Sequence, residues 1–333
     1  MVILGYITKT EGENAKKEKV AFVAKNIRMI APHFLGYITQ ELVKKYGEDT
    51  IQSGGLTVIS SLDLDLQAKA EESVKKYSAL NETNYSVKNM ALLSEDPKTG
   101  QILAMVGSRD FFDLDNEGNF NAVFALRQPG SSFKPFAYLT AFKKGYTDRT
   151  VVFDLPTNFS TDISHPYTPK NYDGKFRGPV DLRNSLAQSL NIPAVKILYL
   201  AGINDTLNTA KSLGIDTLTE DANYYGLPLV LGGGAVKLYE MVGAYSVFSQ
   251  EGMYHKQNTI LKVTDQSGKV LEEFKDDVNQ VFDAEPIRLL NNILSDNVAR
   301  APLYSGGLNN PLFFGEGIPV AAKTGTSQDS RDA

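Results

Sequence analysis

The sequence predicts an α+β protein in which an antiparallel sheet is flanked by a helical subdomain. Two apolar runs, NMALLSEDP and QILAMVGS, are joined by Asp96-Pro97-Lys98-Thr99-Gly100, a turn signal that predicts a hairpin. Helical patterns dominate from Ser131 to about Ser249, and PIRLLNNILSDNVARAP has the spacing of an amphipathic helix. With 333 residues, 42% of them hydrophobic, the chain is long enough for one large domain with smaller neighbours.

Composition excludes several classes of function. The net charge of −5 offers no basic surface for nucleic acid. The absence of cysteine excludes disulfides and thiolate metal sites, and the three histidines (His33, His165, His255) are too scattered for a metal cluster. We therefore expect no metal and no cofactor. No apolar run approaches the ~20 residues needed to span a bilayer, and the start MVILGYITKTEGENAKK lacks the pattern of a signal peptide.

The first 85 residues predict small peripheral elements. Residues from about 8 to 27 are rich in Lys, Glu and Ala, which indicates a solvated helix that ends before Pro32. LGYITQELVKKYGED predicts a second helix with Gly47 as its stop. GGLTVISSLDLDLQAKAEESVKKY predicts a strand, a turn and a helix capped by Asp63 or Asp65. Together these elements predict a linker module.

Later loops and strands are marked by turn residues. The triplet Lys98-Thr99-Gly100 is assigned to the hairpin turn, because Pro97 fixes φ and Gly100 permits a positive φ. In the loop 111–121, Asp113, Asp115 and Glu117 have a spacing similar to that of a calcium-binding loop. The twelfth position of such a loop must be a bidentate Glu, and here it is Phe124, so we reject a calcium site. Gln266-Ser267-Gly268 predicts a second hairpin turn, and IPVAAKTGT predicts a buried strand.

A serine nucleophile with a lysine base is predicted in QPGSSFKPFAYLTAFKKG. Ser131 and Lys134 are three residues apart, so a helix places them on one face. A helix N-terminus favours negative charge on the serine oxygen, and a desolvated lysine near another cation can act as a base. Ser73 and Lys76 match the same spacing, but they lie in the charged helix AEESVKKY, where Lys76 would stay solvated.

Two further segments complete the pattern. In LRNSLAQSLNIPAVKILYLAG we prefer Ser189 and Asn191, at a helix end near Pro193, over the rival Ser295-Asp296-Asn297, which we expect to lie within a helix. Lys323, Thr324, Gly325 and Thr326 suit a substrate carboxylate, because a cation and two hydroxyls can bind it while glycine permits close backbone approach. The backbone N–H groups of Thr326 and Ser131 could form an oxyanion hole.

These motifs, in this order and spacing, resemble the transpeptidase half of a class A penicillin-binding protein. The resemblance extends over nearly the whole chain and includes NYDGKFRGPVDLRNSLAQSLNIPAV and LGGGAVKLYEMVGAYSVFSQEG. It implies the serine β-lactamase and penicillin-binding transpeptidase fold. It also implies three parts: the residual last helix of a glycosyltransferase domain (1–30), a linker module (31–85) and the transpeptidase domain (86–333).

The resemblance implies a peptidoglycan D,D-transpeptidase. Ser131 would attack a D-Ala-D-Ala stem peptide, Lys134 would accept its proton, and Ser189 would relay a proton to the departing D-Ala with Lys323 nearby. Asn191 would bind peptide amides, while Thr324 and Thr326 would hold the terminal carboxylate beside Gly325. The implied partners are stem peptides, an amine acceptor and β-lactams, at the extracytoplasmic face of a bacterial membrane.

The chain departs from the family pattern at both ends. A membrane anchor and most of a glycosyltransferase domain are expected in the parent protein, and two more strands with a terminal helix are expected after the Lys323 strand. We therefore expect a C-terminally incomplete fragment whose Lys323 strand is an unpaired edge. This leaves the activity of the chain open.

Other functions remain to be weighed. A serine β-lactamase would need a further carboxylate for deacylation, and its E-x-x-L-N stretch is absent, since Glu220 in TLTEDANYY lacks the Leu-Asn. A β-lactam-sensing binding module would acylate without turnover. An inactive fragment of the enzyme would act only through its surface.

Overall fold

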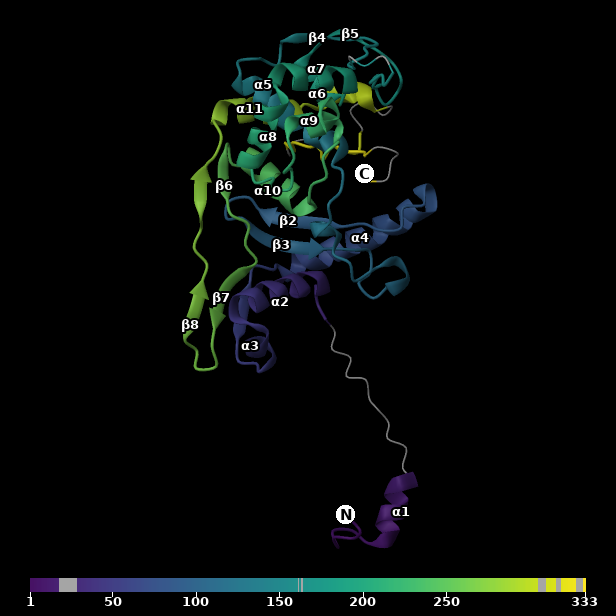
Figure 1. Ribbon diagram of the computed structural model, residues 1–333, viewed down its shortest axis with the longest axis vertical. Coiled ribbons are helices and arrows are strands. Elements are labelled where there is room, and N and C mark those ends of the chain that lie inside the picture. The colour runs from purple at the N-terminus through teal and green to yellow at the C-terminus, as the bar shows by residue number, and fades with distance from the viewer. Residues whose placement is uncertain (18–28, 161, 163, 305–309, 316–318, 328–331) are drawn as a thin grey trace.

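The computed structural model describes residues 1–17, 29–160, 162, 164–304, 310–315, 319–327 and 332–333. The pairs between its strands are antiparallel, and helices pack against several of the strands, in keeping with the predicted α+β class (Figure 1). None of the helices in these ranges is long and apolar enough to cross a membrane.

The N-terminal elements follow the predicted order. They are α1 (Lys9–Lys17), α2 (Pro32–Tyr46), α3 (Glu48–Gln52), β1 (Thr57–Ser60) and α4 (Leu64–Tyr85). Pro32 begins α2 rather than only ending an earlier helix, since its missing N–H is not needed in a first turn. Gly47 ends α2 and Asp63 caps α4, accepting from the N–H groups of Asp65 and Leu66, as predicted. The second half of the predicted first helix, residues 18–27, lies outside the described residues.

The first predicted hairpin is confirmed as β2 (Leu92–Asp96) and β3 (Gln101–Val106). Its turn is closed by Asp96, whose carboxylate accepts from the Lys98 N–H and the Thr99 hydroxyl, while Gly100 adopts a φ of +69°. The first Lys-Thr-Gly triplet therefore has a structural role in a turn. Helix α4 packs on β3 and α10 (Leu238–Ser249) on β2, so the hairpin lies between helices (Figure 1).

A second small sheet joins the N-terminal elements to a late part of the chain. Strand β1 pairs with β7 (Ile260–Thr264), which pairs with β8 (Val270–Glu273) around the predicted turn at Gln266-Ser267-Gly268. A hydrophobic cluster that includes Phe34, Ile102 and Val263 lies beneath this junction. The predicted linker module is thus packed against the hairpin; its boundaries remain a prediction.

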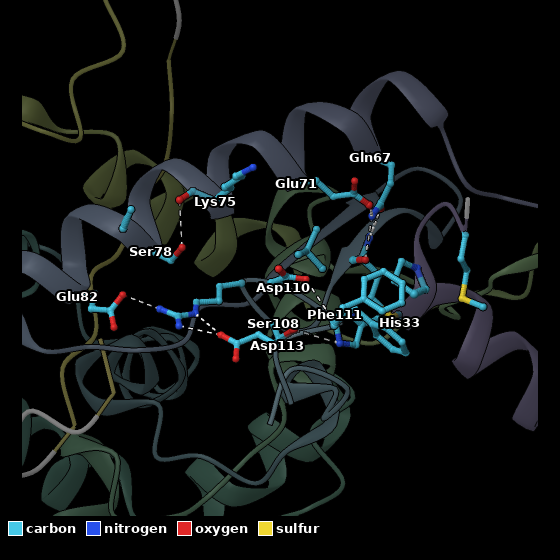
Figure 2. Close-up of a pocket in the computed structure, with 17 residues that line it drawn as sticks. His33, Gln67, Glu71, Lys75, Ser78, Glu82, Ser108, Asp110, Phe111 and Asp113 are labelled. Carbon is cyan, nitrogen blue, oxygen red and sulfur yellow. Dashed lines mark hydrogen bonds and ion pairs between the residues drawn. The ribbon is translucent and has the colours of Figure 1, made fainter. Parts of the chain in front are cut away.

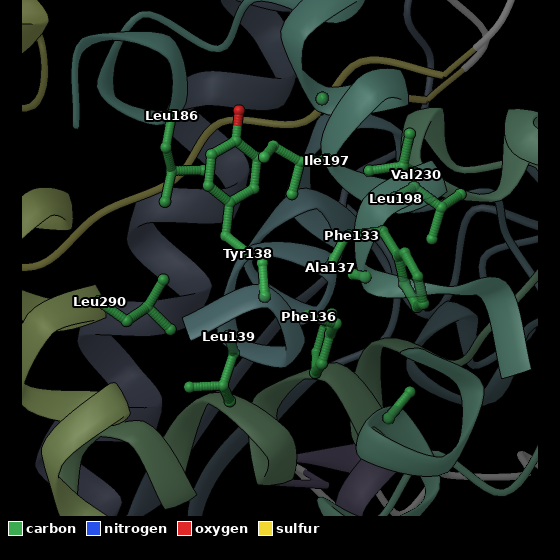
Figure 3. Close-up of a cluster of buried hydrophobic side chains, with 14 of the residues drawn as sticks. Phe133, Phe136, Ala137, Tyr138, Leu139, Leu186, Ile197, Leu198, Val230 and Leu290 are labelled. Carbon is green, nitrogen blue, oxygen red and sulfur yellow. The ribbon is translucent and has the colours of Figure 1, made fainter. Parts of the chain in front are cut away.

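The main core is the predicted helical region (Figure 3). Helix α5 (Lys134–Lys143) is buried at every position from Lys134 to Phe142, and the 3-10 turn η3 (Gly130–Phe133) leads into it. Against it pack α6 (Leu182–Ala187), α7 (Asn191–Ala201), α8 (Ile203–Ser212), η4 (Leu227–Leu231) and α11 (Ala284–Leu294), and α9 (Ala222–Tyr225) packs on α8. A helix buried all round needs no amphipathic stripe, and this packing fixes the position of its N-terminus.

Several elements differ from the prediction. The sequence analysis missed β4 (Val151–Asp154) paired with β5 (Gly178–Asp181), and β6 (Met253–His255) paired with β9 (Val278–Gln280). These strands have three or four residues, too few for a periodicity to stand out. The remaining short elements are η1 (Leu114–Asn116) in the predicted loop 111–121, η2 (Ala122–Phe124) directly after that loop, and α12 (Asn297–Arg300) and η5 (Ala301–Leu303) near the end.

Two predictions near the C-terminus are wrong. The predicted helix 286–302 breaks after Leu294, because Asp296 caps a new helix, α12; Ser295 therefore lies at a helix junction and not within a helix. The strand predicted for IPVAAKTGT (318–326) is absent from its described residues, 319–326. A strand requires a hydrogen-bonded neighbour, and the β2–β3 hairpin does not pair with this segment in the part of the chain that the structure describes.

Candidate active site

Ser131 lies on a tight turn at the entrance to the buried helix α5. Gly130 adopts a φ of +56°, and Ser131 follows it in η3, half-buried. Two hydrogen bonds of Ser132 fix the turn. Its hydroxyl donates to the Pro129 carbonyl (2.6 Å), and its carbonyl accepts from the hydroxyl of the half-buried Tyr245 (2.8 Å). Among the described residues the Ser131 hydroxyl has no hydrogen-bond partner, so it is free to meet a ligand.

Lys134 is fully buried, at 0% exposure, one turn after Ser131. Its Nζ donates to the Ser189 carbonyl (2.6 Å) and to Asn191 Oδ1 (2.7 Å), with a longer contact to Ser189 Oγ (3.4 Å). Burial, and then the positive charge of Lys323, hold the pKa of Lys134 well below its usual value. A lysine whose pKa is lowered gives up its proton more readily, which suits the role of a base that the sequence analysis predicted for it.

Ser189 is held between two helices in a conformation that non-glycine residues rarely adopt. The sequence analysis expected a helix to end near Asn191; instead α6 ends at Ala187 and Asn191 begins α7. Ser189 closes α6 with a φ of +56°, and the next N–H, of Leu190, donates back to the Ser185 carbonyl (2.9 Å). This turn directs both the carbonyl and the hydroxyl of Ser189 toward lysines.

Lys323 reaches the same hydroxyl from the other side. Its Nζ donates to Ser189 Oγ (2.8 Å) and to the Thr324 carbonyl (2.7 Å). Burial, and then the positive charge of Arg300, lower the pKa of Lys323 to about 7. The structure therefore brings Lys134, Ser189 and Lys323 together, as the family resemblance implied, with a serine hydroxyl between two amines.

Residues 319–327, called here the docked segment, rest against the turn that carries Ser131. A Cβ on Gly130 would lie 2.3 Å from the Thr326 carbonyl oxygen, and a Cβ on Gly325 would lie 2.5 Å from the Pro129 carbonyl oxygen. Such contacts leave no room for a side chain, so glycine is required on both sides of this interface. Thr324 and Thr326 are exposed, which leaves their hydroxyls accessible, and the predicted oxyanion hole stays a prediction.

Arg300, which the sequence analysis missed, also holds the docked segment in place through the Ala322 carbonyl. This side chain is 2% exposed, and its guanidinium donates to the carbonyls of Leu294 and Ala322 (3.3 Å to the latter). The Ala322 N–H donates to the Leu294 carbonyl (3.0 Å). Position 300 lies in a predicted helix, and nothing in its sequence context distinguishes a buried arginine from a solvated one.

Asn191 contacts protein groups at both ends of its amide. Oδ1 accepts from Lys134, and Nδ2 donates to the Lys170 carbonyl (2.6 Å). Its backbone N–H donates to Asn171 Oδ1 (2.8 Å). The sequence analysis assigned Asn191 to substrate amides; that role remains a prediction, and Oδ1 retains a second lone pair for it.

The rejected alternatives occupy other places in the fold. Lys76 is exposed on α4, as predicted, with its Nζ over the Tyr77 ring. The Ser295 hydroxyl donates to the Asn291 carbonyl (2.9 Å), and Asp296 caps α12. Both groups serve local structure rather than a cleft.

The cavity drawn in Figure 2 is separate from these residues. It holds about 500 Å³ between α4 and the loop 108–113, with His33, Glu71 and Asp113 among its lining residues. Arg109 bridges Glu82 and Asp113 across it. None of the predicted catalytic or substrate-binding residues lines this cavity.

Known proteins share this sequence and fold. Residues 90–332 match the family described as Penicillin binding protein transpeptidase domain. Penicillin-binding protein 2D of Bacillus subtilis (strain 168) is 35% identical over 262 residues, which cover 76% of this chain and 36% of that protein. Penicillin-binding protein 1A of Clostridium acetobutylicum is 30% identical over 301 residues, which cover 86% of this chain. The chain spans 36% of the length of each of these two curated relatives.

Solved structures with the same fold include penicillin-binding protein 1A from Haemophilus influenzae. It matches with a TM-score of 0.75 at 20% identity, over 92% of this chain and 63% of that one. PonA1 from Mycobacterium tuberculosis, in complex with penicillin V, matches with a TM-score of 0.64 at 21% identity, over 82% of this chain and 71% of that one. These likenesses confirm the predicted fold, and with the family match over residues 90–332 they show that the chain belongs to the penicillin-binding protein transpeptidase domain family.

Proposed function

We propose that this chain carries a D,D-transpeptidase activity that cross-links peptidoglycan stem peptides through an acyl-serine intermediate on Ser131. The observation that carries the proposal is the Ser189 hydroxyl held between Lys134 and Lys323, two amines whose pKa values lie below that of a free lysine. General acid–base catalysis needs groups whose pKa lies near the working pH, and burial moves both of these lysine pKa values in that direction without a histidine. Membership of the family supports the same reaction.

Acylation begins at the free hydroxyl of Ser131. Its oxygen attacks the carbonyl carbon of the penultimate D-Ala, and the lone pair of neutral Lys134 takes the hydroxyl proton. The carbonyl electron pair moves onto its oxygen, which the N–H groups of Ser131 and Thr326 would stabilise. The buried position of Lys134 strengthens each of these electrostatic interactions, because water is excluded around it.

The intermediate then collapses and the terminal D-Ala leaves. The C–N bond breaks, the leaving amine takes a proton from Ser189, and the lysine that gained the first proton restores the Ser189 hydroxyl. The terminal carboxylate would lie against Lys323, Thr324 and Thr326, since a cation and two accessible hydroxyls suit it. Gly325 would allow the backbone of the substrate to approach the docked segment closely.

An amine of a neighbouring stem peptide completes the reaction. It attacks the ester carbonyl, gives up a proton through the same lysine and serine, and releases Ser131 as an alcohol. A β-lactam would acylate Ser131 by opening its ring and would block this step. In the parent protein we place the domain at the extracytoplasmic face of the bacterial membrane, held by an anchor outside this chain.

Labelling with a fluorescent penicillin, followed by mass spectrometry of the adduct, tests the proposal. We expect one adduct on Ser131, lost in Ser131→Ala and retained in Ser73→Ala, which changes the other S-x-x-K match. A label that survives Ser131→Ala, or a folded chain that takes none, contradicts the acyl-serine mechanism on Ser131.

A second assay separates transfer from sensing. The chain is incubated with a peptide ending in D-Ala-D-Ala and an amine acceptor, and released D-Ala and the new amide are measured. We expect both products in equal amounts. A stable penicillin adduct without peptide products would favour the β-lactam-sensing alternative, and rapid loss of the adduct as hydrolysed penicillin would favour a β-lactamase.

A further inference from the structure

A buried carboxylate lies behind Asn191, on a strand that the site motifs do not include. Asp154 ends β4 and is 0% exposed. Its two oxygens accept from Asn171 Nδ2 at 3.0 and 2.8 Å, and one of them accepts from the Arg177 N–H (2.9 Å). Burial of a carboxylate is costly unless donors satisfy its lone pairs, so Asp154 depends on the donors Asn171 Nδ2 and the Arg177 N–H.

Asn171 connects that carboxylate to the site. Its side chain is 5% exposed, and its Oδ1 accepts from the Asn191 N–H (2.8 Å). Its Nδ2 also donates to the Lys175 carbonyl (2.8 Å). The chemistry fixes the orientation of the amide, because a backbone N–H can only donate and a carboxylate can only accept.

The contacts continue without a break to the general base. Asn191 is the first residue of α7, and its Oδ1 accepts from Lys134 Nζ (2.7 Å). Its Nδ2 donates to the carbonyl of Lys170, the residue next to Asn171. The loop that carries residues 170 and 171 therefore holds Asn191 by both its backbone and its side chain.

We propose that Asn171, clamped by Asp154, is a positioning residue for acylation: it fixes Asn191 and, through it, the amine of Lys134. This inference rests on the proposed function of the site. Asn171 touches none of the groups that we expect to react, so its main effect is on the rate of the chemical step. A smaller effect on affinity comes through Asn191, which is predicted to bind substrate amides. Displacements of about 1 Å at a reacting group can lower a rate by about a hundredfold.

The same loop contains a matched control. Asn158 also accepts backbone N–H groups with its Oδ1, from Ser160 (3.1 Å) and Tyr167 (3.0 Å). It is exposed, and neither its amide nor the two groups that it binds contacts Asn191. A change at Asn158 tests the organisation of the loop alone.

The test compares isosteric variants of the full chain. In Asn171→Asp, a second carboxylate faces Asp154 in place of a donor, so the pair repels and Asn191 loses its support. The dependence of Ser131 acylation on penicillin concentration separates the dissociation constant from the limiting acylation rate. We expect the limiting rate to fall about tenfold or more, with the dissociation constant changed by less than about threefold. Asn158→Asp is expected to leave both unchanged.

The exchanged pair, Asp154→Asn with Asn171→Asp, is a rescue variant, which keeps the inference testable if Asn171→Asp alone fails to fold. It restores one buried negative charge, with a donor at 154 facing an acceptor at 171, but a carboxylate oxygen at 171 then faces the Lys175 carbonyl oxygen in place of the Nδ2 that donated to it. We expect it to recover part of the limiting rate that Asn171→Asp loses.

Three results would overturn the inference: a folded Asn171→Asp protein with the wild-type limiting rate, an equal loss in Asn158→Asp, or an exchanged pair that folds and stays as slow as Asn171→Asp. Absence of a Ser131 adduct in the wild-type chain would instead overturn the proposed function.

Discussion

The two sides of the site are held in place in different ways. Ser131, Lys134, Ser189 and Asn191 form the helical side, carried by α5 and by the junction of α6 with α7, at the edge of the main core. The docked segment is held by a few backbone contacts, by Arg300 and by glycines that permit close approach. The packing of the main core fixes the positions of the residues on the helical side. The docked segment, in contrast, can be displaced without disturbing that core.

The largest effect is expected on the helical side. Lys134→Ala removes the proposed base and leaves the Ser189 carbonyl and Asn191 Oδ1 without their donor. We expect the acylation rate with penicillin to fall by about a thousandfold, the scale of general-base catalysis. Lys76→Ala, in the exposed S-x-x-K match, serves as the control and should acylate like wild type. If the acylation rate of Lys134→Ala stayed within about tenfold of the wild-type rate, another group would have to be the base.

An intermediate effect is expected where the docked segment meets the turn. In Gly325→Ala the new Cβ would lie 2.5 Å from the Pro129 carbonyl oxygen, so the segment must move away. We expect acylation to slow by about ten- to a hundredfold, with the midpoint of thermal unfolding nearly unchanged, because the core is untouched. Gly36→Ala, in α2, meets no atom within 4 Å and should acylate normally. A large drop in the unfolding midpoint of Gly325→Ala would show that the two sides are not separable.

The smallest effect concerns the charge of Lys323. Its pKa of about 7 means that the amine is positive below that pH and neutral above it, so binding of an anionic penicillin should weaken as the pH rises through about 7. The Arg300 charge contributes to this lowering, so Arg300→Met should raise the pKa and move the weakening to higher pH. Dissociation constants from acylation curves at several pH values measure the shift. If the dependence of the dissociation constant on pH were unchanged in Arg300→Met, the weakening of binding would have to come from a group other than Lys323.

Much of the fold and the membership of the site could be predicted from local chemistry. The α2 and α4 ends and both hairpin turns follow from Gly47, Asp63, Gly100 and Gly268, whose backbone or capping preferences are local. Ser131, Ser189 and Lys323 were chosen over their look-alikes from neighbouring charges and helix ends, and the structure joins Lys134, Ser189 and Lys323 by hydrogen bonds. The Ser131 hydroxyl makes no hydrogen bond to them among the described residues, so its place in the site remains a prediction.

The remainder depends on partners that are distant in sequence. Residues 319–327 have a composition typical of a strand. A strand forms only beside a neighbour with which it shares hydrogen bonds, and composition alone does not identify that neighbour. Asp154, Asn171 and Arg300 resemble ordinary surface residues in sequence, and only burial against other elements distinguishes them. The preference for Ser189 over Ser295 rested partly on a helix that in fact ends at Leu294.

The pairing of β1 with β7 has a consequence for the order in which this chain matures. Thr57 is paired with Thr264, so the first strand cannot find its neighbour until about two hundred further residues have been synthesised. At about 5–20 residues per second, that interval lasts on the order of ten to forty seconds. During it the edge of β1 and the apolar side chains beneath it stay open to other chains, which makes this early stretch the place where a nascent copy is most exposed to aggregation and to chaperone capture.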